Sequence, residues 1–234
     1  MADNTTFRVM VERIPVVLSD GTTVAGEIGY TDGTDRRSLT AILPPHPNLG
    51  GALDNNVVEA VFEELASEHI AAKLSYRGMD DETGSGHYGL AYWDQLEAGG
   101  DYSLIVRDCV ELLDYLRRDL GGVLEVRLFG YSFGAFIGLQ LLNNVSDITA
   151  FAGITPPLPK YDFEEAAATA RDACQDAVLL VGSREEPLSP AAVLSDFSRR
   201  HGLREMILDC DDHFFRGMES ELARIIRCFL NDST

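Results

Sequence analysis

The chain has 234 residues, 45% of them hydrophobic, and carries a formal net charge of −19 at pH 7. A chain of this length buries one substantial core, so we expect a single domain over residues 1–234. So acidic a surface argues against nucleic acid and anionic membranes as partners, because both bind to cationic surfaces.

Targeting signals are not visible in the sequence. The first residues are polar, and no segment approaches the roughly 18 apolar residues that a membrane span requires. We therefore expect neither a signal peptide nor a transmembrane helix, and a cytoplasmic location. The cysteines at positions 109, 174, 210 and 228 lack metal-ligand spacing, which indicates reduced thiols rather than a metal site.

The N-terminal part of the chain predicts an antiparallel hairpin. Residues 7–18 and 22–30 are rich in β-forming side chains and flank Ser19-Asp20-Gly21. Asp-Gly supplies the positive φ angles of a tight turn.

After the hairpin, strand-like and helix-like segments alternate. The predicted strands cover residues 39–45, 71–76, 123–131, 148–154, 177–182 and 204–210, and the predicted helices cover 55–68, 102–120, 133–143, 163–174, 191–200 and 219–230. This alternation predicts an α/β fold with about six parallel strands and helices on both faces of a twisted sheet. Ligands of such sheets bind beyond the carboxyl ends of the strands.

Residues 79–101 form the longest stretch without clear periodicity, and stretches of this kind are often functional. Its His87, Tyr88, Tyr92 and Trp93 either wall a substrate pocket or pack the segment down. Together with residues 156–174, this segment is a candidate cover for a pocket.

The sequence Gly130-Tyr131-Ser132-Phe133-Gly134 is a GxSxG motif between a predicted strand and a predicted helix. This context is that of a nucleophile elbow, in which the flanking glycines let strand and helix approach. A helix N-terminus also stabilises a developing anion. We therefore interpret Ser132 as a nucleophile.

A serine nucleophile needs a base, and histidine suits that role near neutral pH. His213 follows the last predicted strand and precedes the last predicted helix, whereas His69 and His201 lie at predicted helix ends and His46 and His87 precede the serine. The order serine, acid, histidine favours His213 as the base.

The acid is expected after a late strand, where it would orient the imidazole of His213. Glu185 follows the strand 177–182 and is our choice; the carboxylates that remain as alternatives are Glu186, Asp162, Asp209, Asp211 and Asp212.

The oxyanion hole is expected to use the N–H of Phe133 and a second N–H from residues 45–51. Proline has no N–H, so Asn48 is the predicted second donor and Leu49 the next. His46 is expected to brace this loop.

Nearly end to end, the chain resembles the α/β-hydrolase superfamily, and within it small hydrolases related to dienelactone hydrolases and carboxylesterases. The segments that carry this resemblance are HPNLGGALDNNVV, SYRG, GYSFGA, PPLPKYDF and DDHFF. VGSREE resembles the Gly-x-x-Asp turn of that group, which maps the acid onto Glu185 although glutamate replaces the commoner aspartate. Pro44 stands where the group often has a histidine.

These features predict a serine hydrolase that cleaves a small-molecule ester or thioester through an acyl-enzyme intermediate, without a metal or organic cofactor. Two alternatives remain: a peptidase or acyl-peptide hydrolase, since the same triad cleaves amides, and a non-catalytic interaction protein that keeps the fold. The sequence does not predict the oligomeric state.

Overall fold

A computed structural model of the protein describes residues 8–51, 53–79, 87–122, 125–173, 177–184, 187–210 and 212–232. The strands in this part of the chain are Met10–Val17 (β1), Thr23–Tyr30 (β2), Asp35–Leu43 (β3), His69–Leu74 (β4), Glu125–Tyr131 (β5), Ile148–Ile154 (β6), Val178–Ser183 (β7) and Arg204–Leu208 (β8). The helices are a 3₁₀ turn at Pro47–Leu49 (η1), Asn56–Ala66 (α1), His87–Gly99 (α2), Ser103–Asp119 (α3), Phe133–Asn144 (α4), Glu164–Ala173 (α5), Ala191–His201 (α6) and Glu219–Asp232 (α7).

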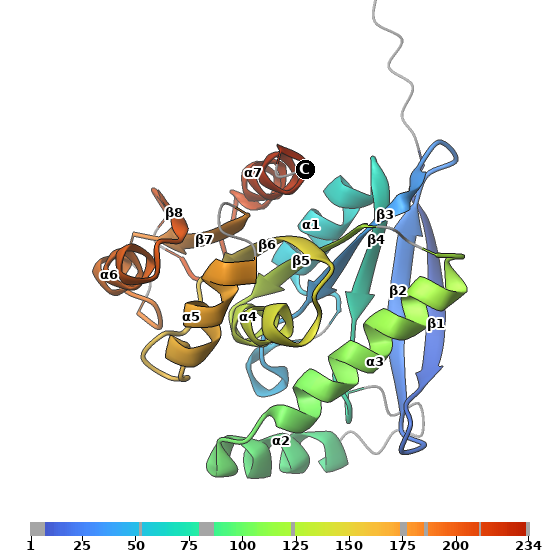
Figure 1. Ribbon diagram of the computed structural model, residues 1–234, viewed down its shortest axis with the longest axis horizontal. Coiled ribbons are helices and arrows are strands. Elements are labelled where there is room, and N and C mark those ends of the chain that lie inside the picture. Colours follow the sequence, from blue (N-terminus) through green and yellow to red (C-terminus); the bar gives the residue numbers. More distant parts are fainter. Residues whose placement is uncertain are drawn as a thin grey trace, which may run out of the picture.

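The strands form one sheet in the order β1-β2-β4-β3-β5-β6-β7-β8 (Figure 1). β1 and β2 are an antiparallel pair, β2 is also antiparallel to β4, and β3 to β8 pair with their neighbours in parallel. This topology confirms the predicted α/β class, the N-terminal hairpin and the parallel strands. The carboxyl ends of β3 to β8 therefore meet at one edge of the sheet.

Helices cover both faces of the sheet, as predicted (Figure 1). α1 and α7 pack against each other on one face, where Phe62 and Ile226 join a core cluster with Phe129 of β5. α3, α4, α5 and α6 lie on the other face, where Leu113 and Ile137 share a core cluster with Leu128. The alternation of side chains along β5 thus feeds two separate cores.

Helix α4 occupies the centre of its layer, between α3 and α5. Apolar and small side chains line nearly its whole circumference, which is typical of a helix that neighbours bury on all sides. A Cβ on Gly138 would lie 2.4 Å from the ring of Phe151, so this glycine lets α4 approach β6 closely. The first residue of α4 therefore has a fixed position at the carboxyl edge of the sheet.

Helix α2 occupies part of the stretch at residues 79–101, where no periodicity in the sequence predicts a helix. Its Trp93 is fully buried and donates a hydrogen bond from Nε1 to the carbonyl oxygen of Arg77 at 3.1 Å. For Trp93 the structure therefore favours packing over lining an open pocket. The side chains of His87 and Tyr88 lie outside the described part of the chain.

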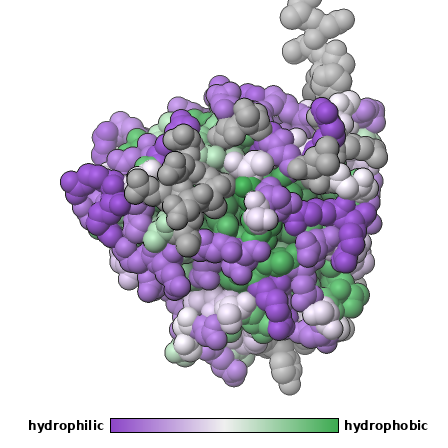
Figure 2. Space-filling model, viewed as in Figure 1, coloured by the Kyte–Doolittle hydropathy of each residue, from purple (hydrophilic) through white to green (hydrophobic). Residues whose placement is uncertain are grey.

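The surface seen in the orientation of Figure 1 is largely hydrophilic, with smaller apolar areas between the charged side chains (Figure 2). Within the described ranges, no helix combines the length and apolar character that crossing a membrane requires.

Candidate active site

Ser132 lies at the sharp turn that joins β5 to α4. Its backbone has φ 55° and ψ −112°, a combination that non-glycine residues rarely adopt. The turn is held by two backbone hydrogen bonds, from Ser132 N–H to Ile154 O at 2.9 Å and from Ala135 N–H to Ser132 O at 2.9 Å. A strained serine at a strand-to-helix turn is the geometry that a nucleophile elbow requires.

The flanking glycines are required by close backbone contacts. A Cβ on Gly130 would lie 2.3 Å from the carbonyl oxygen of Gly134. A Cβ on Gly134 would lie 2.1 Å from the carbonyl oxygen of Leu43 and 2.8 Å from that of Pro44. The predicted elbow thus packs directly against the end of β3 and the first residue of the loop that follows it.

Strained backbone elsewhere in the described ranges lies at the same edge of the sheet. The non-glycine residues with positive φ are Ser132, Thr155 at the end of β6 and Phe215 between β8 and α7. Thr155, which follows β6, and Ser183, the last residue of β7, also have buried hydroxyl oxygens without a hydrogen-bond partner among the described residues. Such features cluster at functional sites, and here they border the carboxyl end of β5.

His213 lies in the turn between β8 and α7, as predicted from its place in the sequence. Tyr131, the residue before Ser132, donates a hydrogen bond from its hydroxyl to the carbonyl oxygen of His213 at 2.9 Å. The rings of Tyr131 and His213 are 5.5 Å apart between centroids. The Asn56 side chain also donates to the carbonyl oxygen of Phe214 at 3.0 Å. These contacts fasten the histidine turn to the elbow strand and to α1.

Three of the other histidines have structural partners. Nε2 of His69 is 2.8 Å from the hydroxyl of Thr40, and Nε2 of His201 is 2.8 Å from Glu164. His46 caps the 3₁₀ turn η1. The side chain of His87 is outside the described residues, so His213 stays the predicted base.

Several candidate acids are engaged elsewhere. Asp162 accepts a hydrogen bond from the N–H of Glu164 at the start of α5, and exposed Asp209 forms an ion pair with Arg184 at 2.7 Å. Asp212 accepts a hydrogen bond from the N–H of Phe214 at 3.0 Å. The predicted acid Glu185, like Glu186 and Asp211, lies outside the described residues, so its assignment stays a prediction.

In the loop after β3, the predicted oxyanion donor Asn48 has other hydrogen-bond partners. The backbone N–H of Asn48 donates to Nδ1 of His46 at 3.2 Å, and its side chain donates to Asp94 at 2.7 Å. The N–H groups of Leu49 and Gly51 both donate to the carbonyl oxygen of His46. The capping side chain of His46 turns the Asn48 N–H into the loop, so neither Asn48 nor Leu49 offers a free donor.

The N–H groups of this loop that keep no acceptor among the described residues are those of His46 and Gly50. Gly50 is exposed, whereas His46 is buried against the start of α4, with its ring 5.1 Å from that of Phe133. Phe133 is the first residue of α4, and N–H groups in a first helical turn have no acceptor within the helix. His46 and Phe133 are thus two buried residues near the start of α4 that the oxyanion-hole proposal can use.

The Phe133 ring is held by an aromatic cluster that no pattern in the sequence predicts. The rings with centroids 5.1–5.7 Å from it come from five parts of the chain, namely His46, Tyr76, Trp93, Tyr102 and Tyr161. Edge-to-face contacts of this kind favour one arrangement of the rings. The cluster therefore fixes Phe133 and joins the loop after β3, α2 and the connection between β6 and α5.

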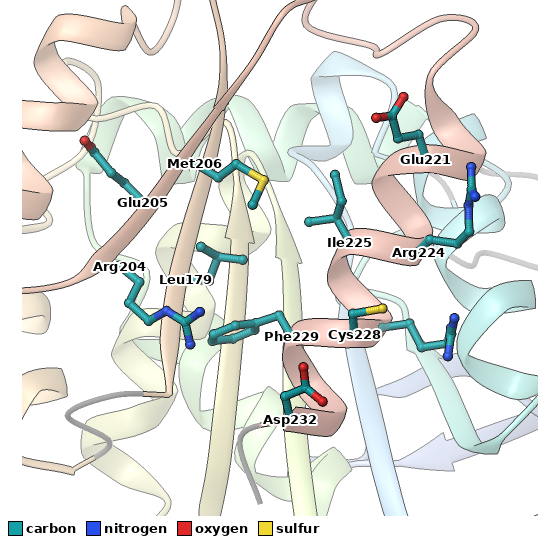
Figure 3. Close-up of a pocket in the computed structure, with 11 residues that line it drawn as sticks. Leu179, Arg204, Glu205, Met206, Glu221, Arg224, Ile225, Cys228, Phe229 and Asp232 are labelled. Carbon is teal, nitrogen blue, oxygen red and sulfur yellow. The ribbon is translucent and has the colours of Figure 1, made fainter.

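A separate groove of about 570 Å³ lies between the edge strand β8 and helix α7 (Figure 3). Met206, Ile225 and Phe229 form its apolar part, and the Arg204 guanidinium lies 5.0 Å from the centre of the Phe229 ring. Neither Ser132 nor His213 lines this groove, so it is distinct from the candidate active site.

Comparison with known proteins agrees with this architecture. No protein-family model matches the chain. An uncharacterised protein of Rickettsia prowazekii is 24% identical over 203 residues, which cover 82% of this chain and 78% of that protein.

Solved structures resemble the chain over nearly its whole length. An α/β serine hydrolase homologue from Coxiella burnetii superposes with a TM-score of 0.71 at 18% identity and covers 94% of this chain and 96% of its own. A protein from Xanthomonas campestris, described as a member of α/β serine hydrolase without lid, gives a TM-score of 0.74 at 15% identity. The match covers 97% of this chain and 96% of that protein.

Proposed function

Because the chain has the α/β-hydrolase fold, we propose that it is a serine hydrolase that cleaves a carboxylic ester or thioester of a small molecule through an acyl-enzyme intermediate. The observation that carries this proposal is the strained backbone of Ser132 between two glycines that admit no Cβ. Strain of this kind persists only where the surrounding structure holds it, and here it would present a hydroxyl at the carboxyl edge of the sheet.

In the proposed reaction, Ser132 Oγ attacks the carbonyl carbon of the substrate while its proton passes to His213. The tetrahedral intermediate then collapses, the bond to the leaving oxygen or sulfur breaks, and His213 gives that atom its proton. Water attacks the acyl-enzyme next; His213 takes the proton of the water and returns it to Ser132 Oγ as the acid is released. These steps need no metal or organic cofactor.

Glu185 is the proposed acid of this triad. It would accept the Nδ1–H of His213, which leaves Nε2 free to take the serine proton and stabilises the imidazolium. Glu185 comes two residues after Ser183, the last residue of β7. Asp162, Asp209 and Asp212 already have hydrogen-bond or ion-pair partners. This supports choosing the acid from the carboxylates at positions 185, 186 and 211.

For the oxyanion hole we propose the N–H groups of Phe133 and His46. The developing negative charge on the substrate oxygen would lie beside the first turn of α4, where free N–H groups stabilise it. The packing of Gly134 against Leu43 and Pro44 supports the choice of His46, because His46 follows Pro44 by only two residues.

A fluorophosphonate probe tests the activated serine directly. We expect the wild type to be labelled at both low and high salt and Ser132→Ala to be unlabelled. The labelling rate of His213→Ala should be lower than that of the wild type by a factor of about 10⁴ or more. Ser220→Ala, which changes an exposed serine in α7, is the matched control and should label like the wild type. Absence of labelling of the folded wild type at both salt concentrations, or undiminished labelling of Ser132→Ala, would overturn the proposal.

A further inference from the structure

Glu97 of α2 is the centre of a polar cluster beside the proposed oxyanion hole. Its Oε2 accepts hydrogen bonds from the hydroxyls of Tyr102 at 2.8 Å and Tyr161 at 3.3 Å. Its Oε1 pairs with Lys160 Nζ at 2.5 Å. Oε2 also lies 3.3 Å from Nε2 of His46. One carboxylate thus joins α2 to the loop after β3, to the start of α3 and to the connection between β6 and α5.

The hydrogen bonding of His46 determines where its ring carries a proton. Asn48 N–H donates to Nδ1, so Nδ1 must be unprotonated. Burial lowers the pKa of His46, which keeps the ring neutral. A neutral imidazole with a bare Nδ1 carries its proton on Nε2, the atom that faces Glu97.

The Nε2–H of His46 is fully buried and has no well-aligned hydrogen bond among the described residues, so the nearby Glu97 carboxylate is its electrostatic partner. Burial opposes the charged form of Glu97, but hydrogen bonds from Lys160 and Tyr102 outweigh it and lower the pKa of the carboxyl group. An ionised carboxylate only accepts hydrogen bonds, and it therefore selects the Nε2–H tautomer. In the other tautomer, the N–H of Asn48 would face an N–H on Nδ1.

We propose that Glu97 is a positioning residue for the oxyanion loop at residues 46–51. Through the ring of His46 it holds Asn48 N–H inside the loop and keeps the backbone N–H of His46 beside that of Phe133. The consequence for turnover rests on the proposed serine hydrolase function. The link between Glu97 and the tautomer of His46 does not rest on it.

The catalytic test is Glu97→Gln, which keeps the size of the side chain and removes its charge. Because the oxyanion develops only in the transition state, we expect kcat to fall about 10- to 100-fold, with KM changed less than about 3-fold. Glu164→Gln is the matched control, since Glu164 also contacts a histidine Nε2, that of His201, and pairs with a cation, Arg200. The control should keep kcat within about 2-fold of the wild-type value, because Glu164 joins α5 to α6 and not α2 to the oxyanion loop.

A double-mutant cycle separates positioning through His46 from a general structural role. In a His46→Ala background, Glu97→Gln should lower kcat by less than about 2-fold, because the ring through which it acts is gone. The proposal would be overturned if the kcat losses of Glu97→Gln and His46→Ala multiplied in the double variant, or if Glu97→Gln had the wild-type kcat. Either result would leave the hydrolase function intact.

A spectroscopic readout does not need activity. Nitrogen NMR of histidine-labelled protein should show the Nε2–H tautomer of His46 in the wild type and in Glu164→Gln, and a mixture of tautomers in Glu97→Gln. If the wild type hydrolyses nothing and labels with no probe, the proposed function fails, and the NMR result still decides whether Glu97 sets the tautomer. An unchanged tautomer in Glu97→Gln would refute that link.

Discussion

Ser132 can adopt its strained backbone because the residues two positions away on either side have no side chain. The Gly134 backbone touches the carbonyl groups of Leu43 and Pro44, which are backbone atoms and cannot rotate away as a side-chain end can. Any added carbon must therefore push α4 from the end of β3. The same displacement would separate Phe133 N–H from the loop after β3, so stability and activity are coupled at this residue.

Replacing Gly134 with Ala should lower both stability and activity. The new Cβ would lie 2.1 Å from Leu43 O, and we expect a loss of about 3 kcal/mol or more in the free energy of unfolding, at the upper end of overpacking costs. Urea unfolding measures this loss. Gly33→Ala is the control, because its Cβ would meet no atom within 4 Å, and it should change stability by less than about 0.5 kcal/mol. Equal midpoints for the two variants would contradict the packing argument.

A pair of substitutions at His46 tests its backbone as an oxyanion donor. His46 has φ −61°, which matches the fixed φ of proline. His46→Pro removes both the ring and the N–H, whereas His46→Ala removes the ring alone. If the N–H stabilises the oxyanion, kcat of the proline variant should fall a further 10²- to 10³-fold or so below that of the alanine variant. Equal kcat values in steady-state ester hydrolysis would assign the second donor to another residue.

At the scale of elements, periodicity was sufficient to predict the strands and most helices. The strands β6 and β7 are nearly continuous apolar runs, and α3 and α7 each have one apolar face, so both patterns are visible in the sequence. Helix α2 is different because it contacts η1, Gly78 and the aromatic cluster around Phe133, and its apolar residues do not form one stripe. Such a helix depends on tertiary contacts that no local pattern encodes.

The same limit applies to the site. The strained turn at Ser132 could be predicted because GxSxG fixes a local geometry, and the place of His213 because the order of elements fixes it; their roles as nucleophile and base remain proposals. The proposed second oxyanion donor, His46, could not be predicted, since the proposal depends on which N–H groups the His46 ring and carbonyl engage. The role of Glu97 was equally hidden, because its partners come from positions 46, 102, 160 and 161.

Between elements, Arg77 joins the segment after β4 to the β1–β2 turn and to α3. Its guanidinium bonds both oxygens of Asp108, which is 3% exposed, and also Asp20 at 3.0 Å. The hydrogen bonds to Asp108 and Asp20 raise the pKa of Arg77. Hydrogen bonding with Thr22, and then with Arg77, lowers the pKa of Asp20 to about 2. The pair with Asp108 is the buried part of this connection.

Arg77→Met should therefore destabilise the protein by about 3–5 kcal/mol, because it leaves the Asp108 carboxylate buried without its counter-ion. Replacing Asp108 with Leu in the same chain should recover part of the loss, since no unpaired charge remains. Arg107→Met is the control: this arginine is exposed on the same helix as Asp108 and should cost about 0.5 kcal/mol or less. Chemical unfolding of the four proteins measures these differences; a double variant no more stable than Arg77→Met would contradict the argument.

At the scale of the whole molecule, acidic side chains outnumber basic ones 38 to 19. Both lysines of the chain are in ion pairs with glutamates, Lys73 with Glu27 at 2.7 Å and Lys160 with Glu97 at 2.5 Å. Even if every basic residue formed one ion pair, half of the carboxylates would keep their charge without a counter-ion. Repulsion among them opposes the compact state, and salt screens it.

We therefore expect added salt to stabilise this protein. Raising NaCl from about 0.05 M to about 1 M shortens the Debye length to about 3 Å, which weakens repulsion between exposed carboxylates more than contacts between paired ions. A gain of ~2 kcal/mol in the free energy of unfolding would raise Tm by about 4–8 °C in a chain of this size, which calorimetry can measure.

Tetramethylammonium chloride should act like NaCl, because screening depends on ionic strength and not on the identity of the cation. A variant with the exposed Asp32, Asp54, Glu63 and Glu221 changed to their amides carries less negative charge and should respond less to salt. A Tm that is flat or falls with NaCl would mean that the ion pairs, not the excess carboxylates, dominate the electrostatics of the fold.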